Sequence, residues 1–172
     1  MSSKRMHSRI WIQDNVFHKQ YPGISHKQWN RLHNVATLLS QAQLSPRLLS
    51  SDIHRKQLSW EVVTPLTRFS PEEDPPEHFL KMGITGIKQQ IREKIHMLHD
   101  LGYGHGDLHI GNLGMNAEGN IVLLDIDTVF LIHGKKTKWL RDFIRHGYDS
   151  DLSLEELAEM DWENWQTDWL ES

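Results

Sequence analysis

An apolar stripe at helical spacing constrains the fold of this sequence more than any other feature. The stripe predicts an amphipathic helix from about residue 84 to residue 100. Its members are Ile84, Ile87, Ile91, Ile95 and Leu98. Gly102 and Gly104 end the helix. Two short segments follow, residues 112–116 and 120–126, and the turn between them predicts a hairpin.

The rest of the chain predicts a mixture of strands and helices. Residues 8–21 read as a hairpin with a turn at residues 13–15, and a capping box at Ser25 starts a helix. Residues 44–52 only interrupt the pattern, and residues 57–66 read as a buried strand that runs into an extended link at Pro65. A second capping box, at Ser153, starts a C-terminal helix. The expected fold class is α+β, in a single domain over residues 1–172.

Composition excludes several classes of function. The 172 residues contain no cysteine, which excludes disulfides, thiol nucleophiles and sulfur-ligated zinc. The formal net charge of −4 does not call for nucleic acid or an anionic membrane. The first residues lack the apolar run of a signal peptide, and no apolar run is long enough to span a bilayer. We therefore expect a soluble, cytoplasmic protein without a membrane partner.

Three oxygen-bearing side chains are predicted to meet at the mouth of the second hairpin. Asp107 lies in the glycine-rich loop, Asn112 follows five residues later, and Asp125 ends the second apolar segment. Carboxylates together with phosphate oxygens are the ligands that Mg²⁺ uses. Phosphoryl transfer also needs an acid that orients the acceptor hydroxyl.

The segments "HGDLHIGN" (residues 105–112) and "LLDID" (residues 123–127) resemble the catalytic loop and metal-binding hairpin of the protein-kinase-like superfamily. The resemblance implies a kinase-like fold with a reduced N-lobe and a truncated helical C-lobe. Asp107 would be the catalytic base, Asn112 and Asp125 would hold Mg²⁺, and His105 would brace the loop. Asp127 takes the place of the glycine in the DFG motif, as in aminoglycoside and choline kinases.

The same resemblance, more weakly, gives the N-terminal part an ATP-binding role. Lys19 would pair with the ATP phosphates and so serve in catalysis, and a solvated strand lysine is the ordinary alternative. The backbone of Glu61 and Val63 would bind adenine, flanked by Trp60, and a core strand is the alternative there. The implied cofactors are ATP and Mg²⁺. The implied boundaries are about residues 1–63 for the N-lobe and hinge strand, 64–148 for a minimal C-lobe, and 149–172 for an acidic, Trp-rich C-terminal helix.

Departures from the family pattern indicate which members of the superfamily the sequence resembles most. No glycine precedes Gly23, and no acid lies between Asp14 and Asp52, so the usual glycine-rich loop and the lysine-pairing glutamate are missing. Gly106 replaces the arginine of the HRD motif. This trimmed form resembles RIO kinases and the small kinase of the tRNA-modification complex, whereas His109 resembles aminoglycoside and choline kinases. An activating protein partner would complete the site.

The expected function is therefore ATP-dependent phosphoryl transfer by an atypical Ser/Thr protein kinase to a hydroxyl acceptor, a protein. One alternative is a small-molecule kinase of the aminoglycoside or choline type, and another is a pseudokinase that acts as a binding module. Two non-kinase interpretations of the loop are a zinc site built from His105 and His109, and ordinary turn residues. Nucleic acid is not expected as a partner.

Charge is unevenly placed in the last forty residues. A basic segment, residues 134–146, holds five cations: Lys135, Lys136, Lys138, Arg141 and Arg145. The tail that follows is acidic and carries a helical apolar stripe of Leu154, Ala158, Trp162, Trp165 and Trp169. We expect this helix to dock on the domain, with Glu155, Glu156 and Glu159 facing the basic segment. A solvated basic face is the alternative.

Overall fold

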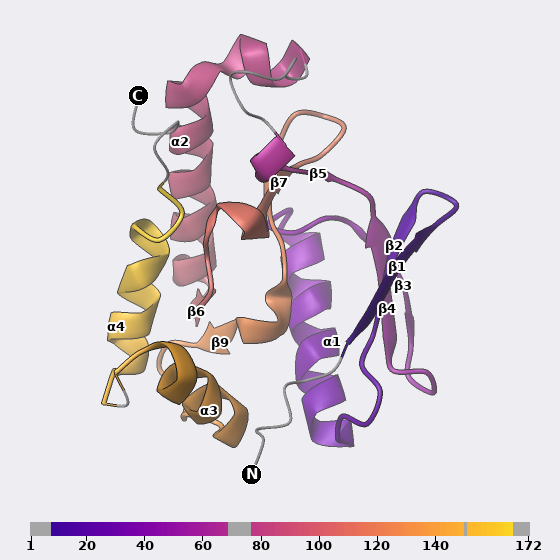
Figure 1. Cartoon of the computed structure of the whole chain (residues 1–172), viewed down its shortest axis with the longest axis vertical. Helices are drawn as coiled ribbons and strands as arrows, with labels where there is room; N and C mark the ends of the chain where they lie inside the picture. Colours follow the sequence, from indigo (N-terminus) through magenta and orange to yellow (C-terminus); the bar gives the residue numbers. More distant parts are fainter. Residues whose placement is uncertain (1–7, 69–76, 150, 167–172) are drawn as a thin grey trace. The chain divides into compact units, whose positions relative to one another are not determined.

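The structure, a computed structural model, describes residues 8–68, 77–149 and 151–166 (Figure 1). It divides into two compact units, residues 1–63 (unit 1) and residues 64–172 (unit 2). Both contain helices together with antiparallel strand pairs, so the predicted α+β class is confirmed. Among the described residues, no helix combines the length and apolar character needed to cross a membrane.

Unit 1 is a four-stranded antiparallel sheet with one long helix. Its elements are β1 (Arg9–Gln13), β2 (Val16–Gln20), α1 (His26–Gln41), β3 (Leu48–Asp52) and β4 (Gln57–Glu61). The strand order is β1-β2-β4-β3. The predicted N-terminal hairpin is confirmed, because Asp14 and Asn15 turn the chain with φ of 51° and 59°. Asp and Asn tolerate this left-handed conformation better than other non-glycine residues.

Helix α1 begins as the sequence predicts. The Ser25 hydroxyl accepts the Gln28 N–H at 3.2 Å, and the Gln28 side chain accepts the Ser25 N–H at 3.2 Å. The buried side of the helix consists of Trp29, Leu32, Val35, Ala36 and Leu39. At its C-terminal end, the Ser40 hydroxyl accepts the Leu48 N–H at 2.9 Å, which ties the helix to β3.

Strand β3 was not predicted. Its residues are mostly exposed and include Ser50 and Ser51, so the apolar alternation that identifies a strand is absent. Pairing with β4 forms the strand, and its contact with α1 includes a 3.2 Å hydrogen bond between Ser51 and His33. The strand therefore depends on its neighbours rather than on its own sequence.

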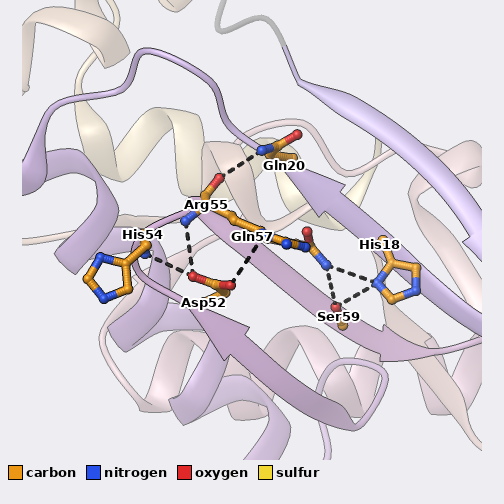
Figure 2. A network of polar contacts seen from close by, with 7 residues as sticks. All are labelled: His18, Gln20, Asp52, His54, Arg55, Gln57 and Ser59. Atoms are coloured by element: carbon orange, nitrogen blue, oxygen red, sulfur yellow. Dashed lines mark hydrogen bonds and ion pairs between the residues drawn. The ribbon is translucent and has the colours of Figure 1, made fainter.

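Polar contacts join the strands of this sheet and the β3–β4 turn (Figure 2). His18 Nδ1 lies 2.7 Å from the Ser59 hydroxyl, and the Gln57 amide donates to both. In the turn, the Asp52 carboxylate accepts the backbone N–H groups of His54 and Arg55 at 2.9 and 3.0 Å. The hydrogen bond from the Arg55 N–H has the largest effect and lowers the pKa of Asp52, and the bond from His54 lowers it further.

Unit 2 combines short strands with helices. Its longer elements are α2 (Glu77–Asp100), β7 (Leu113–Met115), β8 (Ile121–Leu123), α3 (Lys138–Gly147) and α4 (Leu154–Glu159). The remaining elements are β5 (Thr64–Pro65), η1 (Leu66–Arg68), β6 (Tyr103–Gly104), η2 (Ile110–Asn112), η3 (Ile126–Thr128), β9 (Phe130–Leu131) and η4 (Met160–Trp162). The strands form two sheets, β5-β7-β8 and β6-β9.

The predicted helix and second hairpin of unit 2 are confirmed. Four members of the apolar stripe, from Ile87 to Leu98, are fully buried. Non-helical backbone at Gly83 separates residues 77–82 from the predicted helix, which starts at Ile84. Strands β7 and β8 pair with Leu113 opposite Leu123, around the turn at residues 116–120. The link at Pro65 is itself a short strand, which pairs with β7.

The C-terminal helix is shorter than predicted. It begins at the expected Ser153 capping box but ends at Glu159, and a 3₁₀ turn follows, so a continuous helix through Trp165 is wrong. Trp169 lies outside the described residues. Docking of the tail is confirmed, since Leu157 and Trp165 are fully buried. Helix α3, which was not predicted, packs its Leu140 and Ile144 into the same apolar cluster.

Candidate functional site

The glycine-rich loop leaves α2 through a short strand pair. Gly102, with φ of +86°, ends the helix, and β6 then pairs with β9 so that Gly104 lies opposite Phe130. A Cβ atom on Gly104 would lie 2.5 Å from the Phe130 ring, so only glycine fits here. Residues 105–109 follow, outside any helix or strand.

Gly106 has a backbone conformation that favours glycine. Its φ is +84°, which L side chains rarely adopt, and a Cβ atom would lie 3.2 Å from both the Phe130 ring and the Thr128 carbonyl oxygen. A side chain at this position would therefore be strained. The loop conformation itself therefore favours glycine at position 106.

His105 connects the loop to the second hairpin. It is fully buried, its Nε2 donates to the Leu124 carbonyl at 2.7 Å, and its Nδ1 accepts the Asp107 N–H at 3.3 Å. This pattern assigns the neutral tautomer with the proton on Nε2. Because both ring nitrogens are engaged within the chain, the geometry argues against the zinc alternative. No group of three or more His, Cys, Asp or Glu side chains is poised for a metal in the described ranges.

Asn112 is buried between the loop and the hairpin. Its side-chain N–H donates to the backbone carbonyl of Asp107 at 2.7 Å, and its backbone carbonyl accepts the Leu124 N–H at 2.8 Å. Both backbone groups of Leu124 are thus tied to residues 105–112, one step before Asp125. The Asn112 Oδ1 atom is a hard oxygen donor of the kind that Mg²⁺ prefers.

Asp107 is half-buried, and its environment favours the protonated carboxyl. Burial is the largest cause that raises its pKa, and the negative charge of Asp125 adds to the effect. His109, whose Nε2 lies 3.9 Å from Asp107 Oδ2, opposes it, as do His105 and a hydrogen bond from Asn112. A carboxylate with a raised pKa is a stronger base, and the two interacting carboxylates create a place where a cation is favoured.

Asp125 is exposed and has an uncommon backbone conformation. Its φ of 53° and ψ of 72° lie in the left-handed region, which few non-glycine residues adopt, although Asp and Asn tolerate it better than most. Such outliers cluster at functional sites, where surrounding contacts hold them. Asp127, two residues later, is half-buried within η3. The donor set of Asn112 and Asp125 fits Mg²⁺ that is also bound to phosphate oxygens.

Asp161, from the C-terminal tail, bonds to the backbone of the loop. This residue was not predicted from the sequence. It is only 1% exposed, and its carboxylate accepts the His105 N–H at 2.8 Å and the Gly106 N–H at 3.1 Å. His99 Nε2 lies 3.0 Å from the same group. The sequence did contain a signal, because Asp161 falls four residues after the buried Leu157, on the apolar side of the tail.

Two of the residues predicted for the ATP site in unit 1, Lys19 and Trp60, are buried in its sheet. Lys19 is 7% exposed, with its ammonium 5.4 Å from the centre of the Tyr21 ring, so the solvated-lysine alternative is wrong. Trp60 is buried near the Phe17 ring. The Glu61 N–H donates to the Arg47 carbonyl at 3.0 Å, which removes that group as a donor to adenine.

The six predicted site residues divide between the two units. Asp107, Asn112 and Asp125 come together in unit 2, whereas Lys19, Glu61 and the half-buried Val63 belong to unit 1. No protein-family model matches the sequence, and no curated protein is significantly similar to it. The function is therefore inferred from the residues themselves.

Proposed function

We propose that the chain is an ATP- and Mg²⁺-dependent phosphotransferase, acting in the cytoplasm as an atypical Ser/Thr protein kinase. The observation that carries the proposal is the bonding of Asn112, which joins the Asp107 carbonyl at 2.7 Å to the Leu124 N–H at 2.8 Å. These bonds tie Asn112 to the backbone of Asp107 and to the residue before Asp125, and the carboxylates of Asp107 and Asp125 interact electrostatically. Phosphoryl transfer needs such a base next to oxygen ligands for Mg²⁺.

The proposal includes a protein-kinase-like fold. Unit 1, a sheet with one helix, is the reduced N-lobe, and unit 2 is the minimal C-lobe with the catalytic loop and the β7–β8 hairpin. In support, α2 leads into the loop, and the hairpin returns the chain to Asp125 beside it. The C-terminal tail takes the place of the missing C-lobe helices, with Asp161 bonded to the loop.

In the proposed reaction, Asp107 orients the acceptor hydroxyl and takes its proton. The hydroxyl oxygen forms a bond to the γ-phosphorus, the bond from that phosphorus to the β–γ bridging oxygen breaks, and ADP leaves. Asn112 and Asp125 would hold Mg²⁺, which supplies charge neutralisation at the phosphates when bound. Lys19 would bind the phosphates.

The test measures nucleotide binding and phosphoryl transfer separately. The full chain is incubated with Mg-ATP labelled at the γ-phosphate, alone and with cell extract, and protein and small-molecule products are separated. Asp107→Asn should lower the transfer rate by about 10²–10⁴-fold while Mg-ATP affinity stays unchanged. Asp125→Asn should abolish Mg²⁺-dependent binding and transfer. Asp151→Asn, an exposed carboxylate of the same unit, is the matched control.

Each alternative has its own outcome in this test. A labelled small molecule instead of protein would indicate the small-molecule kinase, and nucleotide binding without any transfer would indicate a pseudokinase. Unchanged Mg-ATP affinity and activity in Asp125→Asn would overturn its metal role. If Asp107→Asn loses nucleotide binding while the fold stays intact, Asp107 is not the base.

A further inference from the structure

Helix α3 has two chemically opposite sides. On one side Leu140 and Ile144 are buried in a cluster with Leu154 and Leu157. The rings of Trp139 and Phe143 lie against this cluster and stack on each other, with centroids 5.8 Å apart and an interplanar angle of 11°. This side anchors the helix in unit 2.

The opposite side is a stripe of exposed cations, Lys138, Arg141 and Arg145, which we call the basic stripe. Spacings of three and four residues place them along one face of the helix. Asp142, the helix's acid, is half-buried at the edge of this face. Over residues 8–68, 77–149 and 151–166, no member of the stripe forms an ion pair, and Arg141 donates only to the Lys136 carbonyl, at 3.3 Å.

The acids of the tail do not neutralise the stripe. Glu155 lies 3.6 Å from His133, and Glu156 closes the capping box by accepting the Ser153 N–H at 2.7 Å. Lys136 interacts electrostatically with Glu156, and its ammonium donates to the Leu152 carbonyl. Within the described part of the chain, the predicted facing of acidic tail and basic segment is thus limited to Lys136.

Helix α3, which carries the stripe, ends at a residue that contacts the candidate catalytic loop. Helix α3 is capped by Tyr148, three residues after Arg145, and the Tyr148 hydroxyl lies 3.5 Å from the Gly106 carbonyl. The pKa of Tyr148 is raised by burial first and then by the charges of Asp107 and Asp161. Arg145 therefore lies three residues before the residue whose hydroxyl reaches the loop that carries Asp107.

We propose that the basic stripe docks an acidic segment of the protein acceptor next to the hydroxyl that is phosphorylated, an inference that rests on the proposed function. From Lys138 to Arg145 the helix rises about 10 Å. An extended peptide advances about 3.3 Å per residue, so the stripe matches acids within a window of roughly three residues. Opposite charges across such a contact supply specificity and a faster encounter.

A peptide fits this surface better than a nucleic acid does. Glu155, Glu156 and Glu159 lie on α4, which packs in the same cluster as α3, and the whole chain carries a formal charge of −4. A long polyanion would meet these acids as well as the stripe. The aromatic rings of α3 pack against the apolar cluster, so they are not presented for stacking with bases.

The experiment measures binding of the full chain to three fluorescent probes by anisotropy. The probes are a short serine peptide flanked by glutamates, the same peptide with glutamines, and a single-stranded oligonucleotide of similar charge. The variant Lys138→Gln/Arg145→Gln removes two stripe cations that form no hydrogen bond or ion pair within the described part of the chain. Lys88→Gln/Arg92→Gln on α2 removes the same charge elsewhere in unit 2 and is the matched control.

We expect the acidic peptide to bind about ten-fold more tightly than the neutral one, and the stripe variant to lose roughly five-fold in affinity for it. The control should change less than about two-fold, and high salt should remove the preference. Equal binding of both peptides, an equal loss in both variants, or tighter binding of the oligonucleotide would overturn the proposal.

Transfer assays with the same peptides separate this proposal from the proposed function. Stripe-dependent peptide binding without any phosphoryl transfer supports the docking surface and overturns the kinase. Transfer at equal rates to both peptides supports the kinase and overturns the docking surface. Faster transfer to the acidic peptide, lost in Lys138→Gln/Arg145→Gln and kept in the control, supports both.

Discussion

Two polar networks of this protein differ in what they support. In unit 1, His18, Gln57 and Ser59 meet on the face of a sheet whose strands already pair through their backbones (Figure 2). In unit 2, His105, Asn112 and Asp161 bond to a loop that belongs to no helix or strand. The unit 1 network lies on a sheet that backbone hydrogen bonds already hold together. The unit 2 network is what holds the loop in its conformation.

The difference follows from the obligation of buried backbone groups to find partners. A strand satisfies its N–H and C=O groups through the ladder, but residues 105–107 have no ladder and rely on side chains. Asp161 accepts two of these N–H groups and His105 accepts a third. Loss of a side chain should therefore cost more in the unit 2 network than in the unit 1 network.

The largest effect is expected for Asp161→Ala. The substitution leaves the buried N–H groups of His105 and Gly106 without an acceptor, at about 1–3 kcal/mol each, so we expect a loss of about 3 kcal/mol in the free energy of unfolding. Chemical denaturation measures this value. Glu159→Ala, an exposed acid two residues earlier, should change it by less than about 0.5 kcal/mol. Equal effects of the two substitutions would show that Asp161 does not hold the loop.

A smaller loss is expected for Gly106→Ala. The residue keeps φ of +84° and gains a Cβ atom 3.2 Å from the Thr128 carbonyl, so the cost should be about 1–2 kcal/mol. Gly147→Ala is the matched control, because a Cβ atom there contacts nothing within 4 Å, and alanine is the better helix former. Thermal unfolding of both variants tests this pair. A Gly106→Ala protein as stable as the control would mean that the loop does not need its left-handed residue.

In the unit 1 network, Ser59→Ala should cost about 1 kcal/mol, the typical net value of one hydrogen bond. His18 keeps its contact with Gln57 and is partly exposed, so no charge or buried donor is stranded. Ser50→Ala, at the exposed position paired with Ser59 on β3, should be neutral. Urea titrations measure both. A loss as large as that of Asp161→Ala would erase the distinction between the networks.

The smallest effect is a pH dependence of opposite sign in the two networks. The pKa of Asp107 is raised in the folded state, so its favourable contribution is present at low pH and is lost as pH rises through that pKa. Asp107→Asn should accordingly gain stability relative to the natural protein as pH rises from about 4 to 7.

Asp52 supplies the opposite case. Its pKa is lowered in the folded state, so its contribution is present above the ordinary pKa and is lost as pH falls through the folded value. Asp52→Asn should therefore lose stability relative to the natural protein over the same rise in pH. Both effects are reduced by solvent, since Asp107 is partly and Asp52 largely accessible. Unfolding free energies at several pH values give the two slopes, and slopes of the same sign would contradict the assigned environments.

Elements that depend on neighbouring residues in the chain could be read from the sequence. The Ser25 and Ser153 capping boxes, the Asp14–Asn15 turn and the stripe from Ile87 to Leu98 each involve contacts within a few positions, and all were predicted. The Asp107-to-Asn112 spacing was equally local, and the bond between them closes over five residues. The chemical roles of these residues stay a prediction.

The features that the sequence did not predict depend on contacts between segments that are distant in the chain. Strand β3 exists because β4 pairs with it, and the basic residues of α3 concealed an apolar side that packs against α4 and Phe130. The tail helix stops at Glu159, and the turn that follows brings Asp161 to two N–H groups 55 and 56 residues earlier. A sequence shows that an acid falls on a buried face, but not which buried donors it meets. That choice depends on the free energy of satisfying polar groups that only the folded chain brings together.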